Sequence, residues 1–91
     1  ELDRPPQPLN RLSPIYPFNA KRQEIEGYVT LAFIIDKSGR VNDIAIIDAQ
    51  PAQIFNDAAI DAIQKWRFKP GQKDGKPVKT SVQQNITFQL E

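Results

Sequence analysis

Residues 28–39 read YVTLAFIIDKSG, an alternating run that ends in a turn. One side of an extended chain would carry the bulky apolar residues of this run, namely Val29, Leu31, Phe33 and Ile35. A period of two is typical of a β-strand, so residues 28–35 are predicted to be extended. Asp36–Gly39 forms the predicted turn, because Gly39 can adopt a positive φ. The chain is therefore expected to return as the second strand of a hairpin.

The returning strand, residues 41–49, has an irregular pattern. Val41 and Ile44 are three residues apart, whereas Ile44 and Ile46 are two apart. One extra residue near Asn42-Asp43 would produce this slip, and such an insertion is a β-bulge. The second strand is therefore predicted to be bulged close to the turn.

Helices are predicted on both sides of this hairpin. From about residue 54 to residue 65 the apolar residues recur at helical spacing, namely Phe55, Ala59, Ala62 and Trp66. Pro70 and Gly71 keep this helix from continuing, and residues 73–76 are predicted to form a second turn. A shorter helix is expected at residues 17–24, since proline suits the first helical position.

The last segment, residues 78–90, alternates over the longest stretch of the chain. One face is largely apolar and carries Val78, Val82, Ile86, Phe88 and Leu90. The other face is wholly polar and includes Ser81, Gln83, Asn85 and Thr87. An antiparallel strand with one packed and one solvated face has this pattern.

These elements predict an α+β fold, a small three-stranded antiparallel sheet packed by a helix, in the order α-β-β-α-β. If the third strand pairs with the first, it forms one long free edge, and the second strand forms the other. A free edge offers unpaired N–H and C=O groups to an extended peptide. The pattern favours peptide binding by strand addition, with strand exchange into a dimer as a related risk.

The N-terminal part of the chain is predicted to differ from the rest. Five of the eight prolines lie in residues 1–17, and their fixed φ favours extended chain over packed structure. Residues 1–12 are expected to be the flexible end of a Pro-rich spacer, and residues 13–91 to form one domain. No apolar run approaches the about 20 residues needed to span a bilayer.

The composition argues against an enzyme. The chain has no Cys and no His, which removes thiol nucleophiles, the usual metal ligands and the commonest general base. Five aspartates could in principle pair as acid and base, but none lies in a recognisable motif: Asp36, Asp43, Asp48, Asp57 and Asp61. We expect a binding domain with no catalytic residues, no cofactor and no small-molecule substrate.

The charge is unevenly distributed although its net value is only +1. Residues 65–79 hold six cations against Asp74 alone. Such a block could face an acidic partner surface, or it could be a solvated face beside a helix C-terminus, where cations suit the dipole. A nucleic-acid binder is disfavoured, because the net charge is small and residues 24–61 hold seven acidic residues against two basic ones.

The chain as a whole resembles one known family. The resemblance rests on an ordered series of short motifs, namely Tyr16-Pro17, Ala20, Ile25-Glu26-Gly27, Gly39-Arg40-Val41, Phe55, Ala58, Ala62, Lys65-Trp66-Arg67-Phe68-Lys69-Pro70, Phe88 and Leu90. It covers the chain from about Gln7 to its end and is similar to the C-terminal domain of the TonB energy transducers of Gram-negative bacteria. Many of these residues also suit a thin core, since aromatic side chains supply much of its buried area.

The resemblance implies a function and partners. It implies that the Ton box, a short extended segment of TonB-dependent outer-membrane receptors, adds as a strand to the last strand of the domain. It also implies a periplasmic domain on a proline-rich spacer, with the whole protein anchored in the inner membrane by an N-terminal helix. ExbB/ExbD-type proteins would then supply proton-gradient energy for uptake of nutrients such as iron-siderophores. The alternative is a sensor or scaffold module of another periplasmic or membrane protein with the same fold.

Two groups of residues are expected to contact the receptor. The resemblance aligns residues 7–17 with a segment that lies near the Ton box, which makes Arg11, Ser13 and Tyr16 candidates. Well-studied members of the family have Gln in place of Ser13 and Arg in place of Asn19, which suggests a different receptor set. The second group is the polar face of the last strand: Ser81, Gln83, Asn85 and Thr87.

Overall fold

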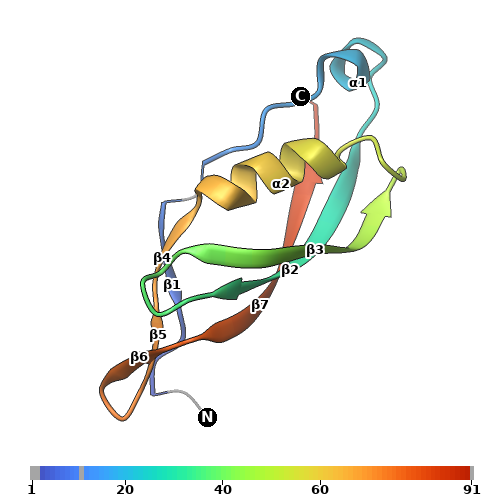
Figure 1. Cartoon of the computed structure of the whole chain (residues 1–91). Helices are drawn as coiled ribbons and strands as arrows, with labels where there is room; N and C mark the ends of the chain where they lie inside the picture. Colours follow the sequence, from blue (N-terminus) through green and yellow to red (C-terminus); the bar gives the residue numbers. More distant parts are fainter. Residues whose placement is uncertain (1–2, 11, 91) are drawn as a thin grey trace.

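The computed structural model describes residues 3–10 and 12–90, and the chain runs through nine elements (Figure 1). In chain order they are β1 (Gln7–Asn10), α1 (Phe18–Arg22), β2 (Gly27–Ile35), β3 (Val41–Gln50), α2 (Asn56–Lys65), β4 (Arg67–Lys69), β5 (Gly71–Lys73), β6 (Lys76–Val78) and β7 (Thr80–Phe88). Both predicted helices and all three predicted strands are present. The short strands β1, β4, β5 and β6 were not predicted from the sequence.

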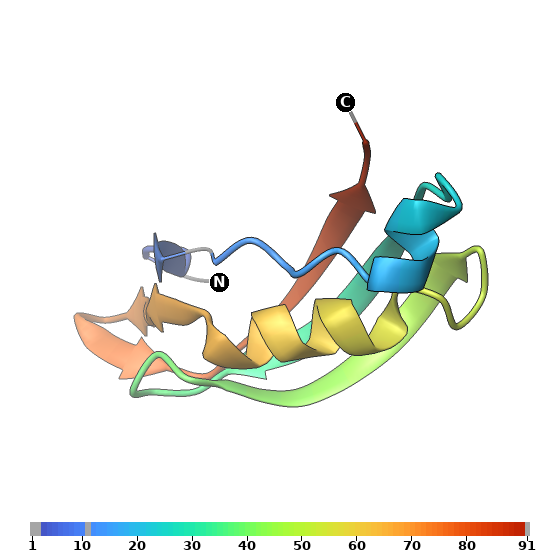
Figure 2. The same ribbon diagram turned by 90° about the horizontal axis from the view of Figure 1, so that it is seen from above.

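The main sheet is antiparallel with strand order β3-β2-β7, and α2 packs across one face of it (Figures 1 and 2). The predicted α+β class is confirmed, and the last strand pairs with the first strand of the hairpin, an arrangement that the sequence left open. The strand β2 lies between β3 and β7, and every second residue from Val29 to Ile35 is buried on its packed side. Two further pairs, β1-β4 and β5-β6, extend the molecule to a length of 50 Å.

The packed face of the sheet and the inner face of α2 form a thin core. Its largest fully buried side chains are Phe33, Phe55, Leu31, Ile35, Ile63 and Val29. Phe55 and Phe88 stack with ring centroids 4.4 Å apart, joining the start of α2 to the end of β7. Each fully buried apolar side chain stabilises a domain by about 1.5–3 kcal/mol, so these residues hold the helix on the sheet.

The hairpin contains the predicted bulge and a second one. Ile34 pairs with Asn42 and Ala32 pairs with Ala45, so β3 has an extra residue there, and Asp43 has a φ of 53°. The second shift lies between the pairs Thr30–Asp48 and Leu31–Ile46, which leaves Ile47 as the extra residue. This bulge was not predicted because residues 44–47 are all apolar, so an extra residue among them does not change the sequence pattern.

Part of the N-terminal segment pairs with the rest of the fold. In β1, Gln7 pairs with Lys69 and Pro8 with Phe68 of β4. Residues 12–17 then run alongside α2 toward α1 (Figures 1 and 2). Proline removes backbone donors but still allows edge pairing, which is why this stretch can form a short strand. The flexibility expected of residues 1–12 stays a prediction.

Candidate functional site: the outer edge of strand β7

The strand β7 has one fully paired side and one open side. All nine of its residues pair with β2 without a register shift, from Phe88 opposite Gly27 to Thr80 opposite Ile35. Within residues 3–10 and 12–90, no strand pairs with its other side. A row of backbone N–H and C=O groups on such an edge is available to another extended chain.

The opposite edge of the sheet, β3, is a poorer template. It carries two bulges and a positive φ at Asp43. Bulges interrupt the spacing of backbone donors and acceptors and twist the edge away from a straight partner. Of the two edges, β7 therefore offers the longer regular run of pairing positions.

The predicted polar residues of the last strand lie together on one face. Ser81, Gln83, Asn85 and Thr87 are all exposed, while Ile86 and Phe88 are buried on the helix side. The Thr30 hydroxyl donates a hydrogen bond to Asn85 Oδ1 at 2.8 Å, and Asn85 Nδ2 donates to Thr87 Oγ1 at 3.4 Å. The first bond crosses from β2 to β7 and the second lies within β7, and together they fix the orientation of the Asn85 side chain on the open face.

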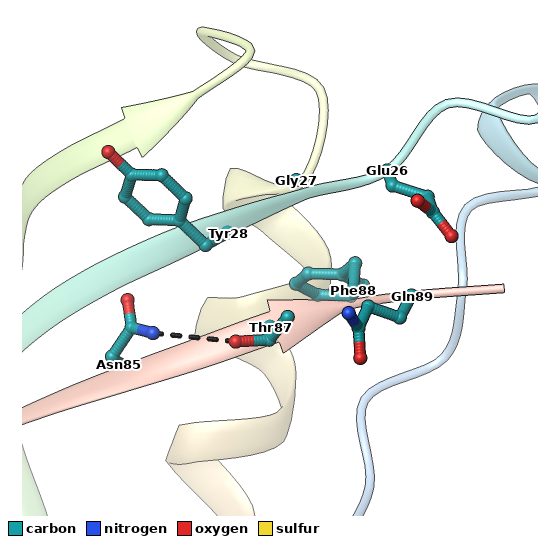
Figure 3. Close-up of a pocket in the computed structure, with 7 residues that line it drawn as sticks. All are labelled: Glu26, Gly27, Tyr28, Asn85, Thr87, Phe88 and Gln89. Carbon is teal, nitrogen blue, oxygen red and sulfur yellow. Dashed lines mark hydrogen bonds between the residues drawn. The ribbon is translucent and has the colours of Figure 1, made fainter.

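A shallow depression of about 500 Å³ lies where this face meets the end of β7 (Figure 3). Its lining residues come from β7 and from the start of β2: Glu26, Gly27, Tyr28, Asn85, Thr87, Phe88 and Gln89. The Tyr28 hydroxyl donates to Asp48 at 2.8 Å, and this hydrogen bond, with smaller effects from partial burial and the charge of Asp48, raises the pKa of Tyr28. The Glu26 carboxylate accepts a bond from the Leu90 N–H at 2.7 Å.

Sequence reasoning did not identify the β2 side of this depression. Glu26 and Tyr28 reach it because β2 and β7 pair in a register that sets Gly27 opposite Phe88. The alternation of β2 does assign Tyr28 to the same face as Thr30. Only the register between strands that are distant in sequence brings them beside Asn85 and Thr87.

The other predicted contact group lies on the helix side of the sheet. Ser13 is exposed and lines a groove of about 490 Å³ between residues 12–17 and α2. Its neighbours in the groove include Leu12, Ile15, Asp57 and Asp61. The structure thus places Ser13 on the face opposite Gln83 and Asn85. Arg11 lies outside the described residues.

Tyr16 is held in the interior by packing. Its ring meets Phe55 and Phe88 edge to face, with centroids 5.5 Å and 5.8 Å away, and its hydroxyl donates to the carbonyl of Ile25. Partial burial, with a smaller contribution from Glu26, raises the pKa of Tyr16. Tyr16 therefore joins the N-terminal segment to the end of β7.

Neither a metal site nor a membrane-spanning helix is found in the described residues. Across residues 3–10 and 12–90, no three carboxylates come close enough together to hold a metal ion. None of the helices in that part of the chain is long and apolar enough to cross a membrane.

Comparison with known proteins identifies close similarity over nearly the whole chain. The family model described as the Gram-negative bacterial TonB protein C-terminal matches residues 13–90. Protein TonB of Pseudomonas aeruginosa is 34% identical over 93% of this chain, and that of Escherichia coli (strain K12) is 37% identical over 93%. The chain spans only 25% and 34% of the length of these two relatives.

A solved structure has the same fold. The solution structure of the Pseudomonas aeruginosa TonB C-terminal domain superimposes with a TM-score of 0.83 at 34% identity, covering 98% of this chain and 90% of that one. The TonB2 protein of Vibrio anguillarum superimposes with a TM-score of 0.71 at 34% identity, covering 98% and 85%.

Proposed function

Because this chain belongs to the family of Gram-negative TonB C-terminal domains, we propose that it binds the Ton box of outer-membrane transporters by strand addition to β7. Domains of this family are periplasmic interaction domains and not enzymes, in agreement with the expected non-enzymatic binding function. A sensor or scaffold module of another protein is not favoured, since both relatives named above are TonB proteins.

One observation supports the mode of binding above all others. The nine residues of β7 form an edge without a register shift, whereas β3 at the other edge is bulged twice. Nine residues extend about 30 Å at about 3.3 Å per residue, which is long enough for a short extended peptide. Pairing through the backbone needs little from side chains, so one edge can serve several transporter sequences.

Side chains next to the edge would set the preference among transporters. An added strand would place alternate side chains beside Ser81, Gln83, Asn85 and Thr87 on the open face. We assign these four residues to the contact surface, together with the depression that contains Tyr28. Ser13 belongs to a second contact on the helix side, Arg11 is proposed as a receptor contact next to it in sequence, and Tyr16 supports that segment by packing on Phe55 and Phe88.

The wider role is part of the same proposal. This chain corresponds to about a third of the length of the Escherichia coli relative. A periplasmic spacer and an inner-membrane anchor would lie in the other part of such a protein, and that part would contact the ExbB/ExbD-type partners. The bound domain would transmit force from proton-gradient energy to the transporter. Nutrient uptake, for example of iron-siderophores, would follow from that coupling.

A titration of the labelled chain with a short Ton-box peptide, followed by NMR, tests the proposal. Amide shifts are expected along residues 80–88 and not along β3. Methylation of the peptide nitrogens that face β7 should abolish binding, and methylation of the alternate nitrogens should leave it. Saturating peptide without shifts in β7, or equal loss with both methylated peptides, would exclude backbone strand addition.

A further inference from the structure

One end of the molecule gathers cationic side chains from three separate parts of the chain. We call this end the basic pole. Its nine exposed cations are Arg4, Lys37, Arg40, Lys65, Arg67, Lys69, Lys73, Lys76 and Lys79. Six of them form the basic block seen in the sequence, and the other three come from the N-terminal segment and the β2–β3 turn.

Backbone pairing brings these parts together (Figure 1). The N–H of Gln72 donates to the carbonyl of Arg4 at 3.0 Å, and the N–H groups of Asp3 and Arg4 donate to Gln72 in return. The N–H of Phe68 donates to the carbonyl of Gly39 at 2.9 Å, next to an antiparallel bridge between Arg40 and Arg67. The clustering is therefore built into the fold.

The charge of the basic pole is large for so small a domain. Nine cations are opposed by five carboxylates, Asp3, Asp36, Asp43, Asp61 and Asp74, which leaves a net charge of +4. In the remainder of the described chain, Lys21 and Arg22 face four carboxylates, a net charge of −2. The small net charge of the whole chain hides this separation. Like charges held together at one end disfavour the compact state unless an anionic partner neutralises them.

The arrangement of the pole indicates which kind of anion it suits. Of its nine cations only Lys65 lines a groove, the one beside α2, and the nearby aromatic residues Trp66 and Phe68 are buried. Single-stranded nucleic acid is normally bound with exposed aromatic side chains on which bases stack. Leu9 of β1, by contrast, is 68% exposed beside β4. An exposed aliphatic side chain on a strand that pairs with Arg67 and Lys69 of β4 suits a lipid headgroup layer.

We propose that the basic pole docks on an anionic phospholipid surface. Lysine and arginine side chains would lie among the phosphates while Leu9 enters the headgroup layer. The docking does not depend on the transporter interaction, because the open face and the outer edge of β7 lie along the molecule and remain available.

Sedimentation with vesicles tests this inference on the 91-residue chain. Binding is expected to phosphatidylcholine vesicles that contain about 30 mol % phosphatidylglycerol and not to pure phosphatidylcholine vesicles. Raising the salt from about 50 mM to about 300 mM should weaken it strongly, since the charges are exposed. The substitutions Lys73→Glu and Lys76→Glu together should lower the partition coefficient at least about 25-fold, at about fivefold for each lost cation.

A matched control separates the basic pole from net charge. Lys21→Glu and Arg22→Glu together change the charge by the same amount at the other end of the molecule, and binding should stay within about twofold of the unmodified chain. Equal loss in both double variants would overturn the proposal. So would binding to soluble polyglutamate or to single-stranded DNA without binding to the anionic vesicles, since the pole would then serve an acidic protein or a nucleic acid. A Leu9→Ser variant with unchanged vesicle binding would exclude the role of Leu9.

Discussion

The indole Nε1 of Trp66 donates a hydrogen bond to the backbone carbonyl of Leu12, 2.9 Å away and 54 positions earlier in the chain. This bond connects the end of α2 to the N-terminal segment that covers the rest of the core. Trp66 is also in aromatic contact with Phe68, with ring centroids 6.3 Å apart. One side chain therefore joins the helix, β4 and the segment that carries Ser13.

Replacing Trp66 with Phe should release the N-terminal segment. The variant keeps much of the aromatic packing but leaves the partly buried carbonyl of Leu12 without this donor, so we expect the free energy of unfolding to fall by about 1–3 kcal/mol. Urea denaturation measures the loss. Hydrogen exchange should increase in residues 12–17 before it increases in β2. Unchanged stability together with unchanged exchange would show that the bond contributes nothing.

Gly39 and Gly75 provide a matched pair of turn glycines. Both have a positive φ, 88° and 75°, but a Cβ on Gly39 would lie 1.9 Å from the carbonyl oxygen of Phe68, whereas Gly75 has nothing within 4 Å. Gly75→Ala should cost about 1–2 kcal/mol from backbone strain alone. Gly39→Ala should cost about 3 kcal/mol or more, because β4 must also move. Thermal unfolding of the two variants tests the difference, and equal losses would contradict the close approach.

The hydroxyls of Tyr16 and Tyr28 differ in exposure, since the bond of Tyr16 is partly buried and that of Tyr28 is exposed. Tyr16→Phe removes the bond to the carbonyl of Ile25 and should cost about 1–2 kcal/mol, while the edge-to-face packing on Phe55 and Phe88 remains. Tyr28→Phe removes an exposed bond to Asp48 and should change stability by less than about 0.5 kcal/mol. Chemical denaturation of both variants checks the ranking. The reverse order would place the structural tyrosine on the open face.

Asp36 should contribute to stability only above acidic pH. Its carboxylate accepts bonds from Ser38, from the Arg40 N–H and from Asn42, and the Ser38 hydroxyl is the largest cause that holds the pKa of Asp36 well below its usual value. A lowered pKa in the folded state means that the stabilisation is present above the unfolded value of about 3.9 and is lost as the pH falls toward the folded value.

Melting temperatures measured from pH 7 down to pH 2 test this dependence. Asp36→Asn should melt lower than the unmodified chain at pH 7, and the gap should close as the pH falls below about 4. Asp43→Asn is the control, since Asp43 also lies near the turn but takes no part in the hydrogen bonds that the Asp36 carboxylate accepts. A gap for Asp36→Asn that stays constant with pH would mean that the turn depends on the shape of the side chain and not on its charge.

Local patterns were sufficient for the main elements of the fold. A period of two predicted β2 and β7, helical spacing predicted α2, and the slip at Val41–Ile44 predicted the bulge at Asp43. Burial is the reason these predictions held. A strand or helix that packs on one face repeats its apolar residues with its own period, so the element can be predicted from the spacing of apolar residues in the sequence.

Short strands and irregularities escaped the same reasoning. The strands β1, β4, β5 and β6 have three or four residues each, too few to show a period. The prolines of residues 1–17 predicted extended chain without packed structure, yet Pro8 pairs with Phe68 in β1, at the outside of β4, where a missing donor is tolerated. The bulge at Ile47 was not predicted, because it lies in a continuous apolar run in which an extra residue does not change the sequence pattern.

The residue types of the β7 face, the absence of catalytic side chains and the membership of a family could be derived from the amino-acid sequence, because each depends on composition and local order. Other features depended on the tertiary structure: β7 as the regular edge and β3 as the bulged one, Ser13 and Asn85 on opposite sides of the sheet, and Arg4, Arg40 and Arg67 at one pole. Each of these is a relation between residues far apart in the chain. Strand register and packing set such relations, and no local periodicity records them.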